Sequence, residues 1–146
     1  MKKLVVVGNG MAGVACVEQI LRHSPKFEIT IFGDETHVNY NRILLSSVLA
    51  GEKASDDIVL NGLDWYQRNG IDLRLGVRIV SVDSQAKTVA GDDGSVTSFD
   101  KLLLATGSVP LIPSIEEVKK EGVFVFRNLT TRERCWSAAA RGSKPS

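Results

Sequence analysis

The pattern of apolar and polar positions changes twice in the first third of the chain. Residues 4–7 form an unbroken apolar run, residues 14–22 are compatible with a helix, and residues 27–32 are again mostly apolar. This pattern predicts a strand, a helix and a second strand in that order. Pro25 disfavours helical backbone in the residue before it, so the helix is expected to close over residues 23–25.

The middle of the chain predicts two short helices, a strand and three short extended pieces. A polar loop after residue 33 leads into an apolar helix ending at Ala50, with Gly51 just past it, and a second helix is predicted over residues 63–68. Alternation at period two predicts a strand over residues 71–75. The extended pieces are separated by turn-rich residues, which predicts an antiparallel β-meander in place of a second crossover helix. These pieces cover residues 77–82, 88–90 and 95–99.

A buried strand is predicted to begin at Lys101 and to end in the small-residue turn Ala105-Thr106-Gly107. Open α/β sheets bind ligands at the carboxyl ends of their parallel strands, so this turn is expected to let backbone approach a ligand. The pattern then weakens and predicts a last strand over residues 122–127 and a helix over residues 130–141. Residues 1–141 are therefore expected to form one domain, followed by a loose tail over 142–146.

The first strand and the first helix are joined by Gly8-Asn9-Gly10-Met11-Ala12-Gly13, which has the spacing G-x-G-x-x-G. Gly8 allows the sharp turn, Gly10 has no side chain to hold a pyrophosphate away, and Gly13 lets the helix pack close to the strand. The helix N-terminus offers unpaired N–H groups and a partial positive charge to phosphates. The alternative is that these glycines serve only a βα turn and bind no ligand. It is disfavoured because the strand, glycines, helix, second strand and acid follow one another at the spacing that a dinucleotide-binding motif requires.

Three charged residues extend this interpretation. Asp34 and Glu35 follow the second strand about twenty residues past the glycines, where an acid that binds a ribose is expected. Arg42 lies in the next loop, and its planar, permanently charged guanidinium suits a phosphate or a carboxylate. A solvated surface arginine is the alternative. The first half of the chain therefore predicts a dinucleotide-binding site.

Composition changes this picture little. The chain has 146 residues, a net charge of +1 and 6% aromatic residues, which is typical of a globular protein and implies no nucleic-acid or membrane partner. The apolar run at the start ends at Gly8, too early for a signal peptide, and a cytoplasmic location is expected. Cys16 and Cys135 form no close pair, which argues against a redox dithiol and a metal cluster. Cys16 is expected to be a small core residue, with a reactive thiol as the alternative.

The combined motifs resemble those of a known family. They are the glycine motif, the acids after the second strand, the loop Tyr40-Asn41-Arg42 with Leu45-Ser46, the meander and Leu104-Ala105-Thr106-Gly107. Together they resemble the FAD-binding half of flavoprotein reductases with two dinucleotide-binding domains, the family of glutathione reductase, ferredoxin reductases and NADH oxidases. Residues 38–52 are most similar to the NAD(P)H-dependent assimilatory nitrite reductase large subunits.

This resemblance implies an α/β, Rossmann-like FAD-binding domain with a parallel sheet and an inserted antiparallel meander. In it, Arg42 pairs with the FAD pyrophosphate, backbone at Ile79 meets the adenine edge, and Thr106-Gly107 lies near the middle of the cofactor. Many relatives have an acid where this chain has Gly33, so the choice between the two ribose acids stays open. No catalytic or metal-binding side chain is implied. The cofactor-binding residues implied are Gly8, Gly10, Met11, Ala12, Gly13, Asp34, Glu35, Asn41, Arg42, Ile79, Ala105, Thr106 and Gly107.

Three departures from the family pattern matter. Ser47 stands where ferredoxin reductases often have a lysine, which favours the nitrite reductase comparison. The chain lacks a C-x-x-x-x-C motif, which disfavours disulfide reductase chemistry. In the family a second domain for NAD(P)H begins just after the segment resembling residues 138–144, so the chain is expected to be a domain truncated before the NAD(P)H domain.

The expected function is therefore the FAD-binding portion of an NAD(P)H-dependent reductase that passes electrons through FAD to a metal centre. One alternative is a non-catalytic FAD- or ADP-binding or interaction module that needs self-association or a partner chain to complete its sheet. A ferredoxin or rubredoxin reductase fragment is another. A plain NAD-binding dehydrogenase domain is disfavoured by the meander. Whether the 146 residues alone are an enzyme stays open.

Overall fold

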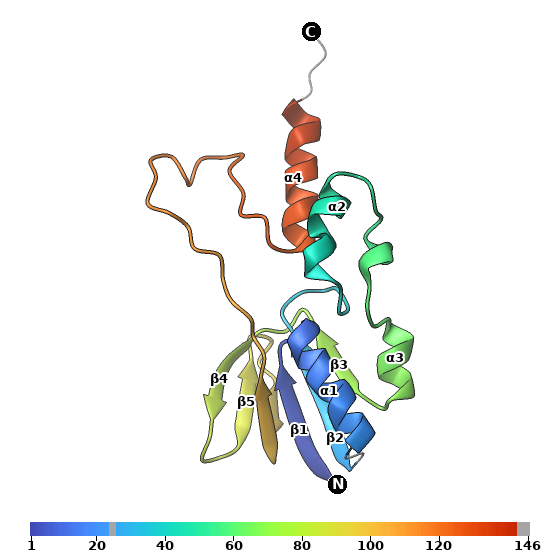
Figure 1. Cartoon of the computed structure of the whole chain (residues 1–146). Helices are drawn as coiled ribbons and strands as arrows, with labels where there is room; N and C mark the ends of the chain where they lie inside the picture. The colour runs from blue at the N-terminus through green and yellow to red at the C-terminus, as the bar shows by residue number, and fades with distance from the viewer. Residues whose placement is uncertain (24–25, 143–146) are drawn as a thin grey trace. The chain divides into compact units, whose positions relative to one another are not determined.

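The computed structural model describes residues 1–23 and 26–142. The chain divides into two compact units (Figure 1). The first contains residues 1–40 and 59–107, and the second contains residues 41–58 and the chain from residue 108 onward.

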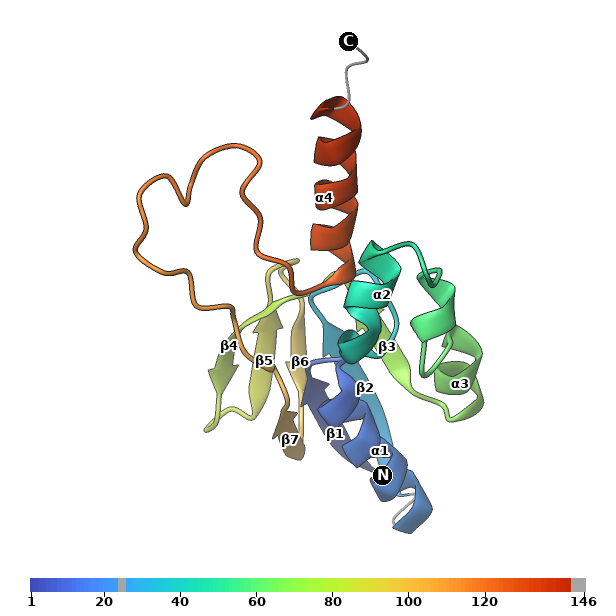
Figure 2. The ribbon, with the colours of Figure 1, turned by 45° about the horizontal axis from the view of Figure 1, so that its top comes forward.

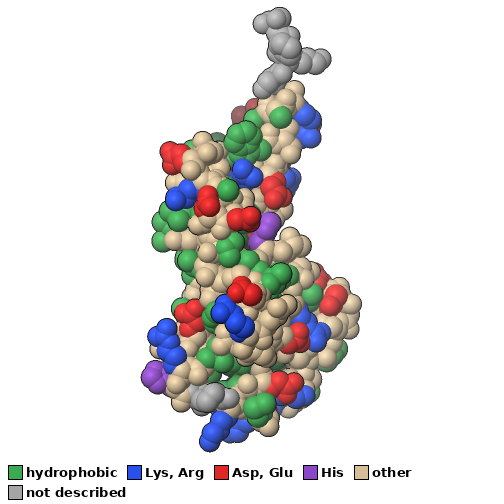
Figure 3. Space-filling model, turned by 90° about the vertical axis from the view of Figure 1, so that its right-hand side faces the viewer, with side chains coloured by type: hydrophobic (Ala, Val, Ile, Leu, Met, Phe, Trp, Pro, Cys, Tyr) green, Lys and Arg blue, Asp and Glu red, His purple; other side chains and the backbone are tan. Residues whose placement is uncertain are grey.

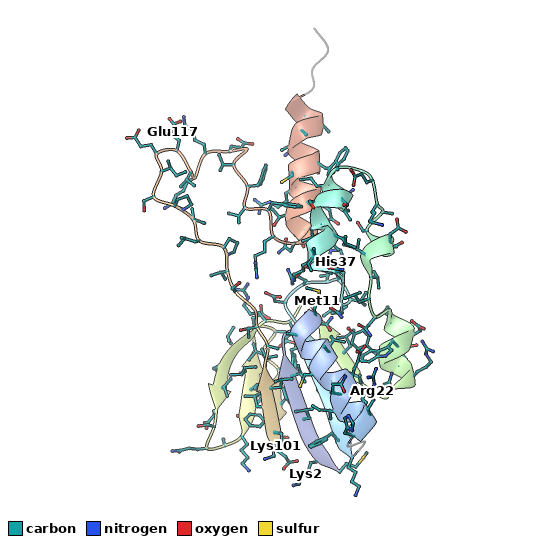
Figure 4. All side chains as sticks on the ribbon, viewed as in Figure 1. Lys2, Met11, Arg22, His37, Lys101 and Glu117 are labelled. Atoms are coloured by element: carbon teal, nitrogen blue, oxygen red, sulfur yellow. The ribbon has the colours of Figure 1, made fainter. Side chains whose placement is uncertain are left out.

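The first unit is built on a four-stranded parallel sheet in the order β3-β2-β1-β7. The register pairs Val7 with both Phe32 and Leu104, so the carboxyl ends of the three adjacent strands are level. In Figure 4, Lys2 and Lys101 lie at the amino ends of their strands, and Met11 lies at the opposite end of the sheet, where the strands end. The strands are β1 (Lys2–Val7), β2 (Phe27–Gly33), β3 (Asp72–Leu75) and β7 (Lys101–Leu104).

Two helices, α1 (Met11–His23) and α3 (Leu63–Arg68), cover one face of the sheet. Successive side chains of a strand point to opposite faces, and the core follows this alternation. Leu4 and Val6 pack with Val17 of α1 and Tyr66 of α3. The unbroken apolar run of β1 is thus explained, because both of its faces are buried.

The meander covers the other face of the sheet. Its strands β4 (Ile79–Asp83), β5 (Thr88–Gly91) and β6 (Val96–Ser98) pair antiparallel in chain order, as Figure 2 shows. Val89 of β5 packs against Val5 and Val7 of β1 and Phe32 of β2. The predicted α/β fold with a parallel sheet and an inserted meander is confirmed.

The second unit is helical. It contains the 3-10 helices η1 (Arg42–Leu44) and η2 (Asp56–Ile58) and the helices α2 (Leu45–Leu49) and α4 (Leu129–Gly142). Helices α2 and α4 are in contact. The helices predicted over residues 43–50 and 130–141 are confirmed, and Gly51 has the positive φ of 79° expected just after a helix.

Two predictions about strands are wrong. Residues 122–127 form no strand, because a strand requires a partner and the described part of the second unit contains none. The segment 101–104 is a strand but is not buried: β7 is the last strand of its sheet, and 61% of Leu104 is exposed. An apolar sequence run cannot distinguish an edge strand from a central one.

The prediction for Cys16 is also wrong, because this residue is exposed. The buried positions of α1 are Gly13, Val14 and Val17, which define one face of the helix. At 3.6 residues per turn, Cys16 points away from that face. The first helix ends at His23, and its predicted closing residues 24–25 lie outside the described residues, as do residues 143–146 of the predicted tail.

On the face drawn in Figure 3, basic and acidic side chains are interspersed, in keeping with the net charge of +1. Among the helices of the described residues, none combines the length and apolar character needed to cross a membrane.

Tyr66 gives the fold a pH dependence. Burial raises the pKa of Tyr66 above the ordinary value of 10.0, so the unfolded chain releases this proton at a lower pH than the folded chain does. We expect the free energy of unfolding to fall as the pH rises from about 9 to about 11, where tyrosines ionise. Urea unfolding at both pH values checks this. The fall should be smaller in Tyr66→Phe, and an equal fall in both proteins would contradict the assignment.

Candidate functional site

The glycine turn is packed directly against the turn that follows β7. Gly8 has a φ of 112°, and its N–H donates to the carbonyl of Phe32 at 2.8 Å. The N–H of Ala105 donates to the carbonyl of Val7, also at 2.8 Å. A Cβ added to Gly8 would lie 2.6 Å from the carbonyl carbon of Ala105. The ends of β1, β2 and β7 are therefore held together by backbone contacts that only glycine allows at position 8.

The three glycines of the motif differ in what surrounds them. A Cβ on Gly13 would lie 2.6 Å from the carbonyl oxygen of Gly8 and 3.2 Å from the Cβ of Ala105, so this glycine serves packing. A Cβ on Gly10 would meet no heavy atom within 4 Å. The fold therefore requires glycine at positions 8 and 13, whereas Gly10 borders open space that a ligand can enter.

The N-terminus of α1 begins beside that open space. The N–H of Val14 donates to the carbonyl of Gly10 at 3.0 Å, which is the first bond within the helix. The amides of Met11, Ala12 and Gly13 therefore have no acceptor one turn earlier in the helix. The first turn contains no acidic residue. Amides of this kind and the positive end of the helix dipole suit an anion.

The two candidate ribose acids have different surroundings. The Asp34 carboxylate is 57% exposed and pairs with the Arg78 guanidinium at 3.4 Å. The Glu35 carboxylate is partly buried and accepts a hydrogen bond from the Tyr40 hydroxyl at 2.6 Å. Asp34 is therefore accessible and loosely paired, whereas Glu35 is partly buried and closely hydrogen-bonded.

Backbone hydrogen bonds connect these acids to the start of the meander. The N–H of Gly76 donates to the carbonyl of Glu35, and the N–H of Val77 donates to the carbonyl of Gly33, both at 3.0 Å. Ile79 follows two residues later, half-buried against the core that the meander shares with the sheet. The predicted adenine-contacting position therefore follows directly after residues whose backbone is hydrogen-bonded to the segment of the predicted ribose acids.

The second unit contains a cavity of about 300 Å³ with two arginines in its lining. Asn41 caps η1, since its side-chain oxygen accepts from the N–H of Ile43 at 3.0 Å. Arg42 donates to the carbonyl of Arg127 at 3.3 Å, and the Arg127 guanidinium donates to the Ser108 hydroxyl at 2.9 Å. The cavity is lined by Arg42, Ile43, Leu45, Ser46, Pro110, Phe126 and Arg127.

Sequence reasoning missed Arg127. It lies at the end of the segment predicted as a strand, and no local motif marks it as part of a site. The residues predicted to bind the cofactor fall into both units. The first unit contains the positions around the glycine turn and the β7 turn, and the second contains Asn41 and Arg42. Among the described residues no group of three histidine, cysteine or acidic side chains is placed to hold a metal ion.

A parallel sheet with a glycine turn after its first strand, and with a meander on its second face, defines the class of α/β dinucleotide-binding domains. Residues 2–141 match the family described as pyridine nucleotide-disulphide oxidoreductase, and the chain belongs to this family.

Curated relatives agree with the resemblance predicted from the sequence. The chain is 49% identical over 129 residues to an assimilatory nitrate reductase electron transfer subunit of Bacillus subtilis (strain 168), covering 88% of this chain and 17% of that protein. It is 46% identical over 144 residues to an NAD(P)H nitrite reductase of the same organism, covering 98% of this chain and 18% of that protein. The chain thus spans less than a fifth of either relative.

A solved structure shows the same fold. NADH:rubredoxin oxidoreductase from Clostridium acetobutylicum superposes with a TM-score of 0.85 at 24% identity, covering 97% of this chain and 36% of that one. The expectation of an N-terminal flavoprotein reductase segment similar to nitrite reductases is confirmed.

Proposed function

We propose that this chain is the FAD-binding portion of an NAD(P)H-dependent flavoprotein reductase of the nitrite reductase large-subunit type. The observation that carries the proposal is the open space at Gly10, between two glycines that the fold requires and beside the unpaired amides of α1. A glycine that packing does not require, placed at a helix N-terminus, fits close approach of a pyrophosphate.

Each part of the cofactor has residues that suit it. Gly10 and the amides of Met11, Ala12 and Gly13 hold the pyrophosphate. Backbone at Ile79 meets the adenine, and the turn 105–107 approaches the middle of the cofactor. The exposed turn position Gly107 has a φ of 72°, so backbone without a side chain is available there.

Two arginines line the cavity of the second unit. The resemblance assigns Arg42 to the pyrophosphate, and its neighbour Arg127 lines the same cavity. The bond from Arg42 to the carbonyl of Arg127 orients the Arg42 guanidinium within that unit, where Asn41 caps the turn that carries it.

FAD, when bound, accepts a hydride from NAD(P)H and releases electrons singly to an acceptor. The residues of this chain bind and orient it, and no side chain here is assigned a catalytic step. The NAD(P)H site and the metal centre that receives electrons belong to other parts of the whole reductase.

We assign the ribose to Asp34 rather than to Glu35, because Asp34 is accessible and loosely paired. Asp34→Asn is expected to raise the Kd for ADP about five- to tenfold, because hydrogen bonds to a charged group contribute more than neutral ones. The same substitution should leave the Kd for 2′-deoxy-ADP nearly unchanged, since that ligand lacks one ribose hydroxyl. Calorimetric titration with both nucleotides measures the two constants.

Glu35→Gln is the matched control for this prediction. It removes the same charge one residue away and keeps an oxygen that can accept from the Tyr40 hydroxyl. We expect it to change the two dissociation constants by a similar small factor. If the Kd values for ADP and 2′-deoxy-ADP become similar in Glu35→Gln but not in Asp34→Asn, Glu35 would be the residue that binds the ribose.

A second candidate function is a binding module without catalysis, favoured by the position of β7. Within the described residues β7 pairs on one side only, with β1, and Leu104 is largely exposed. An unpaired strand edge offers hydrogen-bonding groups to another chain or to a second copy. NADH-dependent reduction of a dye by the FAD-loaded chain would identify the enzyme. Because the NAD(P)H site is proposed to lie in other parts of the reductase, retained flavin without dye reduction fits both functions. Self-association of the chain that Leu104→Lys abolishes, measured by sedimentation velocity, would identify the module.

A further inference from the structure

The second residue of the glycine motif, Asn9, takes part in a hydrogen bond with a residue from the middle of the chain. Its side-chain oxygen accepts from the hydroxyl of Tyr66 at 2.8 Å. Its side-chain nitrogen is buried and has no hydrogen-bond partner among the described residues. Asn9 is thus a turn residue whose amide is fixed at its oxygen alone, next to the open space at Gly10.

The hydroxyl that holds Asn9 is deeply buried. Only 1% of Tyr66 is exposed, and its ring lies in the core between α1, α3 and the sheet. A hydroxyl has one proton, and the Tyr66 hydroxyl donates it to the side-chain oxygen of Asn9. Burial raises the pKa of the Tyr66 hydroxyl, so this hydroxyl keeps its proton and remains a donor above pH 7.

A second set of buried hydrogen bonds reaches the first helix. The side-chain nitrogen of Asn39 donates to the side-chain oxygen of Asn61 at 2.8 Å, and Asn61 donates to a carboxylate oxygen of Glu18 at 3.0 Å. Asn39 and Asn61 are 2% and 7% exposed. These bonds tie Asn39 and Asn61 to α1. The ring of Tyr66 is fixed by its burial in the core, which makes its hydroxyl a fixed point for the turn.

Asn9 is confined by backbone as well. A Cβ added to Gly33, the last residue of β2, would lie 2.9 Å from the Cβ of Asn9. This contact gives a physical reason for glycine at position 33, where a larger residue would push Asn9 out of place. The Asn9 side chain is thus confined between the end of β2 and the hydroxyl of Tyr66.

Packing alone does not account for this arrangement. A phenylalanine at position 66 would fill the same core without the cost of burying a hydroxyl, which is offset only by its hydrogen bonds. One of those bonds ends on the turn residue that separates Gly8 from Gly10. We propose that Asn9 and Tyr66 are positioning residues, whose hydrogen bond holds the turn in the conformation that binds the pyrophosphate of a dinucleotide. This inference rests on the proposed function, because it concerns the same phosphate site.

The test is a set of titrations of the ¹⁵N-labelled 146-residue chain with ADP and with adenosine, followed by amide resonances. Tyr66→Phe is expected to raise the Kd for ADP about five- to tenfold, the size of one buried hydrogen bond. The Kd for adenosine, which has no phosphate, should change less than about twofold. The amide resonances of Gly8 and Gly10 should also shift in the free protein, because the turn loses its anchor.

Asn9→Ala and the double variant test whether the two residues act through one bond. If they do, the double variant binds ADP no more weakly than the weaker single variant. Ile71→Ala is the control for lost stability, since the apolar side chain of Ile71 belongs to the same core cluster as Tyr66 and its backbone bond to the Tyr66 carbonyl is kept in the variant. It should leave the ratio of the two dissociation constants unchanged.

The outcomes separate the two proposals. If the wild-type chain binds ADP and Tyr66→Phe binds it equally well, the positioning role is overturned and the proposed function stands. Equal weakening for ADP and adenosine, or the same change of ratio in Ile71→Ala, would also overturn it by showing a general structural effect. If the wild-type chain binds neither ligand, the proposed function fails. Asn9→Ala gives the same decision if Tyr66→Phe does not fold.

Discussion

Gly8→Ala is expected to lower the free energy of unfolding by about 3 kcal/mol, because it combines left-handed backbone strain with overpacking. The φ of 112° at Gly8 lies in a region that residues with a Cβ rarely adopt. The new methyl group would also press on the carbonyl of Ala105. Ala105 directly follows β7, and its N–H is hydrogen-bonded to the carbonyl of Val7. Its own carbonyl is therefore fixed and cannot rotate away as a side chain would.

Urea unfolding followed by circular dichroism measures this effect. The midpoint should move to much lower urea at an unchanged slope, or the variant should fail to fold. Gly94→Ala is a useful comparison, since Gly94 has a similar positive φ of 83° but no heavy atom near its added Cβ. Gly94→Ala should lower the free energy of unfolding only by the part that comes from backbone strain. Equal losses at the two positions would contradict the packing argument.

Gly10→Ala is expected to abolish most cofactor binding while leaving the fold intact. An added Cβ at Gly10 meets no protein atom within 4 Å, and the residue is not among the glycines with positive φ. The free energy of unfolding should therefore stay within about 0.5 kcal/mol of the original, as for a compatible glycine-to-alanine change. The Kd for FAD should rise at least about tenfold, because a methyl group would occupy the space through which the pyrophosphate approaches the backbone.

The two glycine substitutions form a matched pair. The same chemical change, two residues apart, should affect stability at Gly8 and binding at Gly10. Gly10→Ala with unchanged FAD affinity would show that the open space is not the phosphate site. A large loss of stability in Gly10→Ala would show that the turn is packed differently from the structure.

Most of the first unit could be predicted from the sequence because its signals are local. The glycine spacing, the apolar run of β1 and the turn residues of the meander depend on neighbours within a few residues. Their predicted positions agree with the strands and helices observed. The register that makes the strand ends level follows from parallel pairing of adjacent strands.

The errors concern properties that depend on distant partners. The exposure of β7 depends on which strand pairs with it, and residues 122–127 lack the partner that a strand needs. Cys16 was misjudged because burial in a helix depends on the face, and Ala15 and Cys16 lie outside the face that Val14 and Val17 define. Sequence position alone does not supply this information.

The site shows the same division. The glycines and acids were visible as motifs, whereas the hydrogen bond from Tyr66 to Asn9 joins residues 57 positions apart and leaves no local signal. The ring of Tyr66 is in the core, as its apolar character favours. The hydroxyl at the end of that ring is the part that sequence reasoning could not place. The same holds for Arg127, whose importance comes from the cavity it shares with Arg42.

Binding of FAD by this chain is measured by the visible absorption spectrum of the purified protein, taken before and after FAD is added and unbound flavin is removed by gel filtration. We expect a flavin spectrum that elutes with the protein, FAD as the cofactor released on denaturation, and loss of both in Gly10→Ala. A protein that stays colourless after incubation with FAD, while its circular dichroism shows a folded chain, would contradict an FAD site in these residues.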